Sequence, residues 1–460
     1  MTNRHFLLVC CPAQGQLNPT FELAKRLTRA GARVTLATTV RGLRSMPTLP
    51  EIDGLSYAAF SDGYDDGNVQ KDVPGRVMDE LRRAGSKSLA ELITTLADDG
   101  RRVSFLVYSL LLGWAASVAR DMQVPSAYLS VQSATCFAIY HRFFNRSDGL
   151  CHGGTADIDP SISIKLAGMP LLSSNDIPTF LLPNSPHNYA IKSFQEHIET
   201  LEDDPNPCVL VNTFDALEED AIRAVDSMNL IAIGPLVPVI FSDEEREISD
   251  SSMRIDLFEQ SREYLDWLNS KPDSSAIYVS FGSLVALQQK QTEEIFRALV
   301  ASHRPFLWVI RSSEYGGEVK DMIEPELSEE TGLIVPWCSQ TDVLRHRSIG
   351  CFVTHCGWNS AVESLVAGVP VVACPQFSDQ TTNAKAVEEV WGTGVRAAAN
   401  GEGVVEREEM KRCLEAVMGS GERGEEIRRN ALKWKQLAME AVKSGGPSHS
   451  NLNHFLSTLP

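Results

Sequence analysis

The feature that most constrains the fold is a strand–helix–strand order that begins almost at the first residue. Residues 5–11 predict a strand that is apolar from residue 6 onward, residues 12–19 predict a loop rich in Pro, Gly and Gln, and residues 20–31 have apolar side chains at helical spacing. Residues 34–39, most of them β-branched, then predict a second strand. This order is typical of a parallel, doubly wound α/β sheet. Further apolar strands are predicted at 105–108, 126–131, 209–212 and 230–233.

The same rhythm restarts after an acidic segment. Residues 242–256 are rich in Asp and Glu and have no periodic apolar face, which predicts an exposed linker. Beyond it we expect a helix at 291–302 and strands at 276–280, 306–310, 332–335, 351–354 and 371–374. The chain therefore reads as two Rossmann-like domains, 1–241 and 257–435, followed by a helical tail, 436–460, that packs back on the first domain.

Composition excludes several classes of function. The 42 Lys and Arg against 60 Asp and Glu give a net charge of −18, which argues against a nucleic-acid partner. The uncharged apolar stretch 103–119 is too short to span a bilayer, so no stable membrane insertion is expected. Ten dispersed cysteines indicate reduced thiols and a cytoplasmic protein.

Four residues in the second half of the chain are of the types that bind zinc. They are Cys338, Cys351, His355 and Cys356. No paired C-x-x-C supports a structural zinc site, so packed thiols are the favoured interpretation and no metal is expected.

The segment 337–380 is the most informative part of the chain. Within it, residues 354–360 read Thr-His-Cys-Gly-Trp-Asn-Ser, a strand-to-helix turn in a parallel sheet. Such a turn directs backbone N–H groups and a helix N-terminus toward the edge where anions bind. Gly357 allows close approach of the backbone, and we expect Asn359 and Ser360 both to cap the helix and to donate to a phosphate.

Structural interpretations of the same residues remain open. Ser360 and Glu363 fit a capping box, Trp337 and Trp358 fit core aromatics, and His355 fits a buried, hydrogen-bonded histidine. The fingerprint G-x-G-x-x-G is absent, so a nicotinamide-dependent oxidoreductase gains no support from the fold.

Taken together, segment 337–380 resembles the signature box of the plant family-1 UDP-dependent glycosyltransferases. The resemblance extends to Pro-Ala-Gln-Gly at 12–15, Phe-Gly-Ser at 281–283 and Gly-Gly-Pro-Ser at 445–448. Ser-Asp-Gly at 61–63 is most similar to the group that glucosylates carboxylic acids, hormones and flavonoid or anthocyanin hydroxyls. The resemblance implies a GT-B fold, two Rossmann-like domains facing across a cleft. It also implies inverting transfer of glucose from UDP-glucose.

The resemblance also implies roles for individual residues, with the acceptor in the first domain and the donor in the second. By position, it assigns uracil to Trp337 and the backbone of Cys338, ribose to Gln340 and Glu363, pyrophosphate to Ser283, His355, Gly357, Asn359 and Ser360, and hexose to Trp358, Asp379 and Gln380. His355 and the helix N-terminus would stabilise charge on the departing phosphate. No cofactor or metal is implied beyond the donor.

Two positions depart from the family pattern. Gln16 stands where the family has its general-base histidine, and Ser109 stands where it has the aspartate that orients that histidine. A glutamine can orient an acceptor but cannot take its proton, a function worth about 10²–10⁴ in rate. A carboxylic acid with a pKa of about 4.3 is already ionised at pH 7. The departure therefore predicts an acidic acceptor, either a carboxylic acid or an acidic phenol.

Three alternatives account for the missing dyad. Gln16 is a laboratory substitution, which leaves Ser109 to be explained separately; or another group serves as base, the candidates being Asp62, Asp65, Asp66 and His141. In the third, the chain is a UDP-sugar-binding protein with weak or lost transferase activity.

The acceptor itself is expected to be small, lipophilic and aromatic or terpenoid-like. Gln16, Tyr64, Phe137 and Phe144 are the predicted contacts, together with the turn at 110–113. These side chains suit a flat hydrophobic aglycone, although core packing produces the same pattern. A monomer is expected.

Overall fold

The computed structural model describes residues 4–67, 72–145, 163–182, 185–238, 255, 257 and 263–459. The chain divides into two compact units, Met1–Leu257 with Ala441–Pro460, and Phe258–Glu440. Of the expected linker 242–256, only Ile255 lies within the described residues. In the described part, no helix is both long and apolar enough to cross a membrane.

The first unit is built on a seven-stranded parallel sheet in the order β3-β2-β1-β4-β5-β6-β7. Its strands are β1 (His5–Val9), β2 (Arg33–Thr39), β3 (Leu55–Phe60), β4 (Phe105–Tyr108), β5 (Ser126–Ser130), β6 (Cys208–Val211) and β7 (Asn229–Ala232). The chain winds outward in opposite directions from β1 and β4. These two strands therefore form the switch point at which doubly wound sheets bind ligands.

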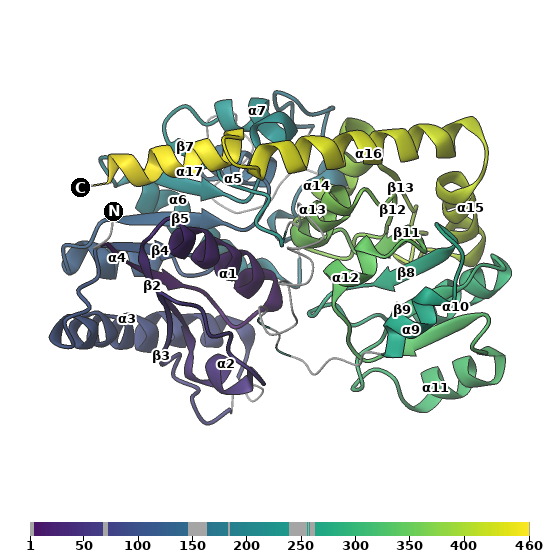
Figure 1. Ribbon diagram of the computed structural model, residues 1–460, viewed down its shortest axis with the longest axis horizontal. Coiled ribbons are helices and arrows are strands. Elements are labelled where there is room, and N and C mark those ends of the chain that lie inside the picture. Colours follow the sequence, from purple (N-terminus) through teal and green to yellow (C-terminus); the bar gives the residue numbers. More distant parts are fainter. Residues whose placement is uncertain are drawn as a thin grey trace. The chain divides into compact units, whose positions relative to one another are not determined.

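Helices cover both faces of this sheet. They are α1 (Gln14–Arg29), α2 (Val40–Ser45), α3 (Pro74–Asp98), α4 (Trp114–Asp121), α5 (Ala134–Phe144), α6 (Ile191–Glu202), α7 (Asp215–Arg223) and α17 (Pro447–Thr458), with short 3-10 turns at Ser174–Asp176, Thr179–Leu181 and Asn188–Ala190. One hydrophobic cluster packs helices α3, α4, α5 and α6 against the sheet. A second cluster packs α1 and α17 against the sheet. The C-terminal α17 lies along β7 (Figure 1).

The second unit repeats the plan with six parallel strands in the order β10-β9-β8-β11-β12-β13. The strands are β8 (Ala276–Ser280), β9 (Phe306–Val309), β10 (Gly332–Val335), β11 (Ile349–Thr354), β12 (Val371–Ala373) and β13 (Gly394–Arg396). The helices are α9 (Glu263–Asn269), α10 (Gln289–Ala301), α11 (Gly317–Ile323), α12 (Gln340–Arg345), α13 (Trp358–Ala367), α14 (Gln380–Lys385), α15 (Arg407–Met418) and α16 (Glu422–Val442), with short segments at Glu324–Glu326 and Ala386–Val390. Here the switch point lies between β8 and β11.

Helix α1 corrects one sequence expectation. The loop predicted at 12–19 is helical from Gln14 onward, and Pro19 lies inside the helix. Tertiary contacts hold this first turn: Gln14 Nε2 donates to the carbonyl of Ile255 (2.8 Å), and its Oε1 accepts from the N–H of Leu257 (3.1 Å). Gln16 therefore projects from a buried helical turn instead of a loop.

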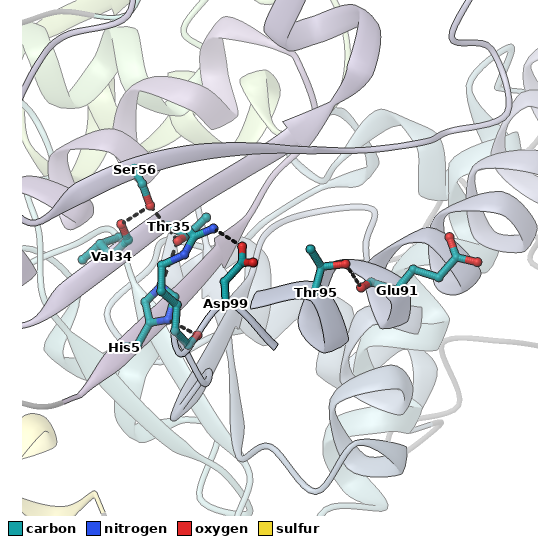
Figure 2. Close-up of polar contacts among 8 residues, drawn as sticks. His5, Val34, Thr35, Ser56, Glu91, Thr95 and Asp99 are labelled. Carbon is teal, nitrogen blue, oxygen red and sulfur yellow. Dashed lines mark hydrogen bonds and ion pairs between the residues drawn. The ribbon is translucent and has the colours of Figure 1, made fainter. Parts of the chain in front are cut away.

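A buried polar row crosses the first three strands (Figure 2). His5 Nδ1 faces the carbonyl of Arg101 (2.7 Å), its Nε2 faces Thr35 Oγ1 (2.8 Å), and Thr35 continues to Ser56 Oγ (2.8 Å). Because a carbonyl only accepts, Nδ1 carries the proton and Nε2 accepts from Thr35. Burial lowers the pKa of His5, which keeps this ring neutral. The row secures the strands near their amino ends and leaves the opposite edge for the site.

Glu218 anchors the start of α5 from α7. Its carboxylate accepts from the N–H groups of Ala134 (2.9 Å) and Thr135 (3.0 Å) and from Thr135 Oγ1 (2.7 Å). We expect Glu218→Ala to lower the free energy of unfolding by about 3 kcal/mol, because it leaves two buried N–H groups unpaired. The measurement is urea denaturation. The control is Glu219→Ala, which removes only an exposed ion pair with Arg223 and should cost under about 1 kcal/mol; equal losses would contradict the assignment.

Candidate functional site

In the second unit, two turns meet at the carboxyl ends of β8 and β11. The strands pair in parallel, with Val353 opposite Val279 and Thr354 opposite Ser280. The segments that follow, 281–283 and 355–357, therefore lie side by side at the switch point. This is the edge at which parallel α/β sheets bind nucleotides.

His355 is tightly packed between two glycines in these turns. A Cβ atom at Gly282 would lie 2.8 Å from His355 Cε1 and 2.9 Å from Nε2, and one at Gly357 would lie 2.7 Å from Nε2. Gly282 has φ +76°, and Cys356 has φ +60°. The backbone of both turns therefore approaches the imidazole to a distance that only glycine permits.

The imidazole of His355 is neutral at physiological pH. Burial lowers its pKa to about 4, and a backbone hydrogen bond at Ser280 opposes the shift only in part. Its Nδ1 lies 3.3 Å from Thr354 Oγ1. Together with the N-terminus of the ten-residue α13, this neutral ring can offer an anion oriented dipoles instead of a positive charge.

Two deeply buried histidines make stability fall in acid. Burial lowers the pKa of His197, in α6 of the first unit, to about 3, and that of His355 to about 4. Both histidines bind a proton more readily in the unfolded state than in the folded state. The free energy of unfolding is therefore unaffected by them above about pH 6.5 and falls as the pH drops below that value. From pH 7 to pH 5 we expect a loss of about 2 kcal/mol per histidine.

Urea denaturation at the two pH values measures this loss. The variant His197→Gln removes one titrating group, so its pH-dependent loss should be smaller than the parent's by about 2 kcal/mol. An identical loss in parent and variant would contradict the prediction for His197.

The start of α13 differs from its expected capping. The N-cap is Gly357, and no side chain caps the helix. Asn359 and Ser360 thus lie inside the first turn, and the capping-box interpretation of Ser360 with Glu363 is wrong. The reason is that the extended Gly357, with φ −55° and ψ 146°, already occupies the N-cap position. These two side chains are therefore not needed for capping.

Gln340, Ser360 and Glu363 instead form one network across α12 and α13. Gln340 Nε2 donates to Glu363 Oε2 (2.7 Å) and to Ser360 Oγ (3.0 Å). Tyr278 donates to Gln340 Oε1 (3.4 Å), and its hydroxyl lies 3.6 Å from Cys338 Sγ. Glu363 is 8% exposed, which leaves a fixed carboxylate able to accept from vicinal hydroxyls.

The two predicted tryptophans differ in environment. Trp337 follows β10 and is half-buried, which leaves ring surface for stacking, and the adjacent Cys338 is buried. Trp358 is 3% exposed and packs on Trp391 with ring centroids 5.9 Å apart. Its side chain belongs largely to the core in this structure.

Asp379 is held by Asn383, a residue that the sequence did not single out, and Gln380 is held by its own loop. Asn383 Nδ2 donates to Asp379 Oδ2 (2.9 Å) and to the carbonyl of Cys356 (3.0 Å). Gln380 Oε1 accepts from two backbone N–H groups of its own loop, at Gln376 (2.8 Å) and Phe377 (3.0 Å). Asn383 therefore joins the turn beside His355 to the loop at 376–380. Its position four residues after Asp379 on a helical turn is the only signal the sequence offers.

Arg311 is a second missed residue. Its guanidinium donates to the carbonyls of Gly282 (3.3 Å) and Val285 (2.7 Å) and pairs with Glu314. It lines a small pocket beside the turn that carries Ser283. The Arg311 guanidinium contacts backbone carbonyls that follow another strand, 29 and 26 positions earlier in the chain. No local sequence pattern therefore predicts these contacts.

In the first unit, Gln16 and Ser109 follow the paired strands β1 and β4. Gln16 is 6% exposed, and its Oε1 accepts from the N–H of Cys11 (3.3 Å). Ser109 is 1% exposed; its N–H donates to the carbonyl of Val9 (3.0 Å), while its Oγ has no hydrogen-bond partner among the described residues. The structure thus brings both positions to one switch point, and neither offers a basic nitrogen.

The four candidate bases lie at different edges of the first sheet. Asp62 follows β3 at the same edge, is 7% exposed and accepts from the N–H of Tyr64 (2.9 Å); Asp65 and Asp66 follow in the same loop. His141 lies 3.0 Å from Ser227, just before β7, and hence at the amino edge of the sheet. Its place is wrong for a base beside Gln16.

The predicted aromatic contacts are distributed over core and surface. Phe137 is 2% exposed and packs against Tyr128, Phe144 is half-buried against Phe143, and the Tyr64 hydroxyl donates to Asp72 (2.9 Å). Within the described residues, cysteines are free thiols, and no three His, Cys, Asp or Glu side chains are grouped to hold a metal.

Comparison with known proteins places this geometry in context. Residues 257–436 match the family model described as UDP-glucoronosyl and UDP-glucosyl transferase. The chain is 50% identical to crocetin glucosyltransferase, chloroplastic, of Gardenia jasminoides, over 98% of this chain and 97% of that protein. It is 49% identical to phloretin 4'-O-glucosyltransferase of Malus domestica, over 100% and 98%. The crystal structure of Os79 from O. sativa in complex with UDP superposes with a TM-score of 0.87 at 33% identity, covering 99% and 100%.

Proposed function

The chain belongs to the plant family-1 UDP-glycosyltransferases and is a glycosyltransferase of the GT-B fold, and we propose that it is an inverting UDP-glucose-dependent O-glucosyltransferase. Its acceptor is a small lipophilic plant metabolite with an acidic oxygen, either a carboxylic acid or an acidic phenolic or flavonoid hydroxyl. The observation that carries the donor half of this proposal is the neutral His355 packed between Gly282 and Gly357 at the start of α13.

The donor site accounts for binding of a dianion by an acidic protein. A helix N-terminus, backbone N–H groups and a neutral imidazole supply oriented dipoles, which hold phosphate without a lysine or arginine. The Gln340–Glu363 pair then presents a fixed carboxylate to the ribose hydroxyls, with Trp337 against uracil. Asp379, tied by Asn383 to the turn beside His355, and Gln380, held in the loop at 376–380, face the hexose.

The transfer is a single displacement. The acceptor oxygen attacks C1 of glucose from the face opposite UDP, a new C1–O bond forms, and the bond from C1 to the β-phosphate oxygen breaks. UDP leaves with the electron pair, and His355 with the α13 N-terminus stabilises the charge that develops on it. A carboxylate acceptor carries no proton to remove, whereas a phenol must lose one to solvent or a nearby carboxylate.

The acceptor half of the proposal follows from Gln16 and Ser109, since neither can act as a general base. Crocetin carries carboxylic acids and phloretin carries phenolic hydroxyls, so the substrates in the names of two relatives are compatible with it. The test compares kcat/KM with UDP-glucose for a carboxylate and an aliphatic alcohol of similar shape. A ratio above about 100 in favour of the carboxylate supports the proposal, and equal rates contradict it.

The missing dyad also favours a second candidate, a UDP-sugar-binding protein with weak or lost transferase activity. Measuring UDP release with and without an acceptor panel distinguishes the two. Acceptor-stimulated release supports the transferase, and tight UDP binding without stimulation supports the binding protein.

We further propose that the protein acts as a metal-independent monomer in the cytoplasm. Undiminished activity in EDTA, a monomer mass in solution and cytoplasmic fluorescence of a tagged chain are the expected results. Plastid import is the competing outcome, since one relative is named as chloroplastic.

A further inference from the structure

One buried histidine of the first unit contacts the turn that carries Ser109. His197, in α6, is 2% exposed, and its Nε2 accepts a hydrogen bond from the backbone N–H of Leu111 (2.9 Å). Because the backbone donates, Nε2 carries no proton and the ring is in its Nδ1–H form. Burial also keeps the pKa of this imidazole low, at about 3, so it remains an acceptor throughout the physiological range.

The turn held in this way has a conformation that its sequence disfavours. Leu111 has φ +70°, a left-handed backbone that a side chain with a Cβ rarely adopts. The backbone N–H of this same residue is the one that donates to His197. The carbonyl of Ser109 accepts from the N–H of Leu112 (3.3 Å), so the conformation at Leu111 is tied directly to Ser109.

Helix α6 also packs closely against Gly113, at the end of the same turn. A Cβ atom at Gly113 would lie 3.0 Å from Glu196 Cγ and 3.3 Å from the backbone nitrogen of His197. Glu196 pairs with Arg82 of α3 (2.6 Å), which anchors this part of α6. The ring of His197 stacks on Tyr108 at an interplanar angle of 2° and lies 4.5 Å from Tyr128.

We propose that His197 is a positioning residue for the acceptor: it sets the turn 109–113, and through it the place of Ser109 beside Gln16. The inference rests on the proposed glucosyl transfer and adds a residue that contacts neither substrate. The contacts of His197 lie within the first unit, so His197 affects how the acceptor is used. UDP-glucose binds in the second unit, so its binding does not depend on His197.

Two variants separate the hydrogen-bond acceptor from the ring. His197→Gln keeps an acceptor atom but loses the aromatic stacking, whereas His197→Phe keeps the stacked ring but offers no acceptor to Leu111. Ile198→Val, at the next position of α6 and equally buried, is the control for general loosening of the core. Steady-state kinetics with UDP-glucose and phloretin, and separately with crocetin, report KM and kcat for each substrate.

If His197 positions the turn, His197→Phe loses about tenfold to 100-fold in acceptor kcat/KM with an unchanged UDP-glucose KM, since small displacements at a reacting centre cost rates of this order. His197→Gln and Ile198→Val then stay within about threefold of the parent. A glutamine variant as impaired as the phenylalanine variant overturns the inference. If His197→Phe does not fold, the glutamine variant decides alone, and a loss beyond threefold overturns it. Failure of the parent to transfer glucose to either acceptor counts against the proposed function instead.

Discussion

Replacing Gly282 with alanine is expected to reduce kcat/KM for UDP-glucose by about 100-fold or more, which is the cost of losing one preorganised donor to a developing oxyanion. Two effects combine at this position. The backbone has φ +76°, which strains any residue with a Cβ, and that Cβ would lie within 2.9 Å of two ring atoms of His355. Since the ring is also confined by Gly357, it must leave its position or the turn that carries Ser283 must move.

The matched control is Gly316→Ala, because a Cβ at that position meets no atom within 4 Å and the backbone there is extended, with φ −164°. Titration calorimetry with UDP separates ground-state binding from transfer. We expect weaker UDP binding and a still larger loss in kcat for Gly282→Ala. Unchanged kinetics in a folded Gly282→Ala variant would show that His355 does not act on the leaving phosphate.

The central strands were predictable because they are buried on both faces. Continuous apolar runs placed the central strands at 105–108 and 276–280 at the residues where the structure has them. Two of the edge strands, β3 and β13, were missed: β3 is mostly half-buried, and β13 has only three residues. The edge strands β7 and β10 were predicted from their apolar runs, so the sequence signal is weak only where an edge strand is also half-buried or very short.

The candidate site divides in a similar way. The sequence alone placed His355 in a strand-to-helix turn, because the carboxyl ends of parallel strands share one edge of the sheet. Gln16 and Ser109 were identified only through the family resemblance. Residues that act through distant backbone were not predictable: His197 and Leu111 are 86 positions apart in the chain. Such contacts depend on the packing of α6 and carry no local pattern.

Replacing Gln16 with histidine is expected to raise kcat/KM for an aliphatic alcohol by about 10²–10⁴, the usual contribution of a general base. The same variant should change turnover of a carboxylic acid by less than about threefold, since that acceptor is ionised without help. Gln16 lies in the first turn of α1, 6% exposed, so a histidine there occupies a fixed position.

The control for this substitution is Gln16→Asn, which removes the contact of Oε1 with the Cys11 N–H without adding a titratable nitrogen. It should leave the alcohol a poor acceptor, so a gain confined to Gln16→His assigns the effect to proton removal.

The gain should also grow with pH through the histidine range, near 6.5 for an unperturbed imidazole, and level off above it. Ser109 offers only a hydroxyl where the family has a carboxylate, so part of the gain should await Ser109→Asp. If the alcohol and the carboxylate gain equally, or if neither gains while the variant remains folded, then the poor basicity of Gln16 does not determine acceptor choice. In that case Asp62, the buried carboxylate at the same edge, becomes the residue to replace.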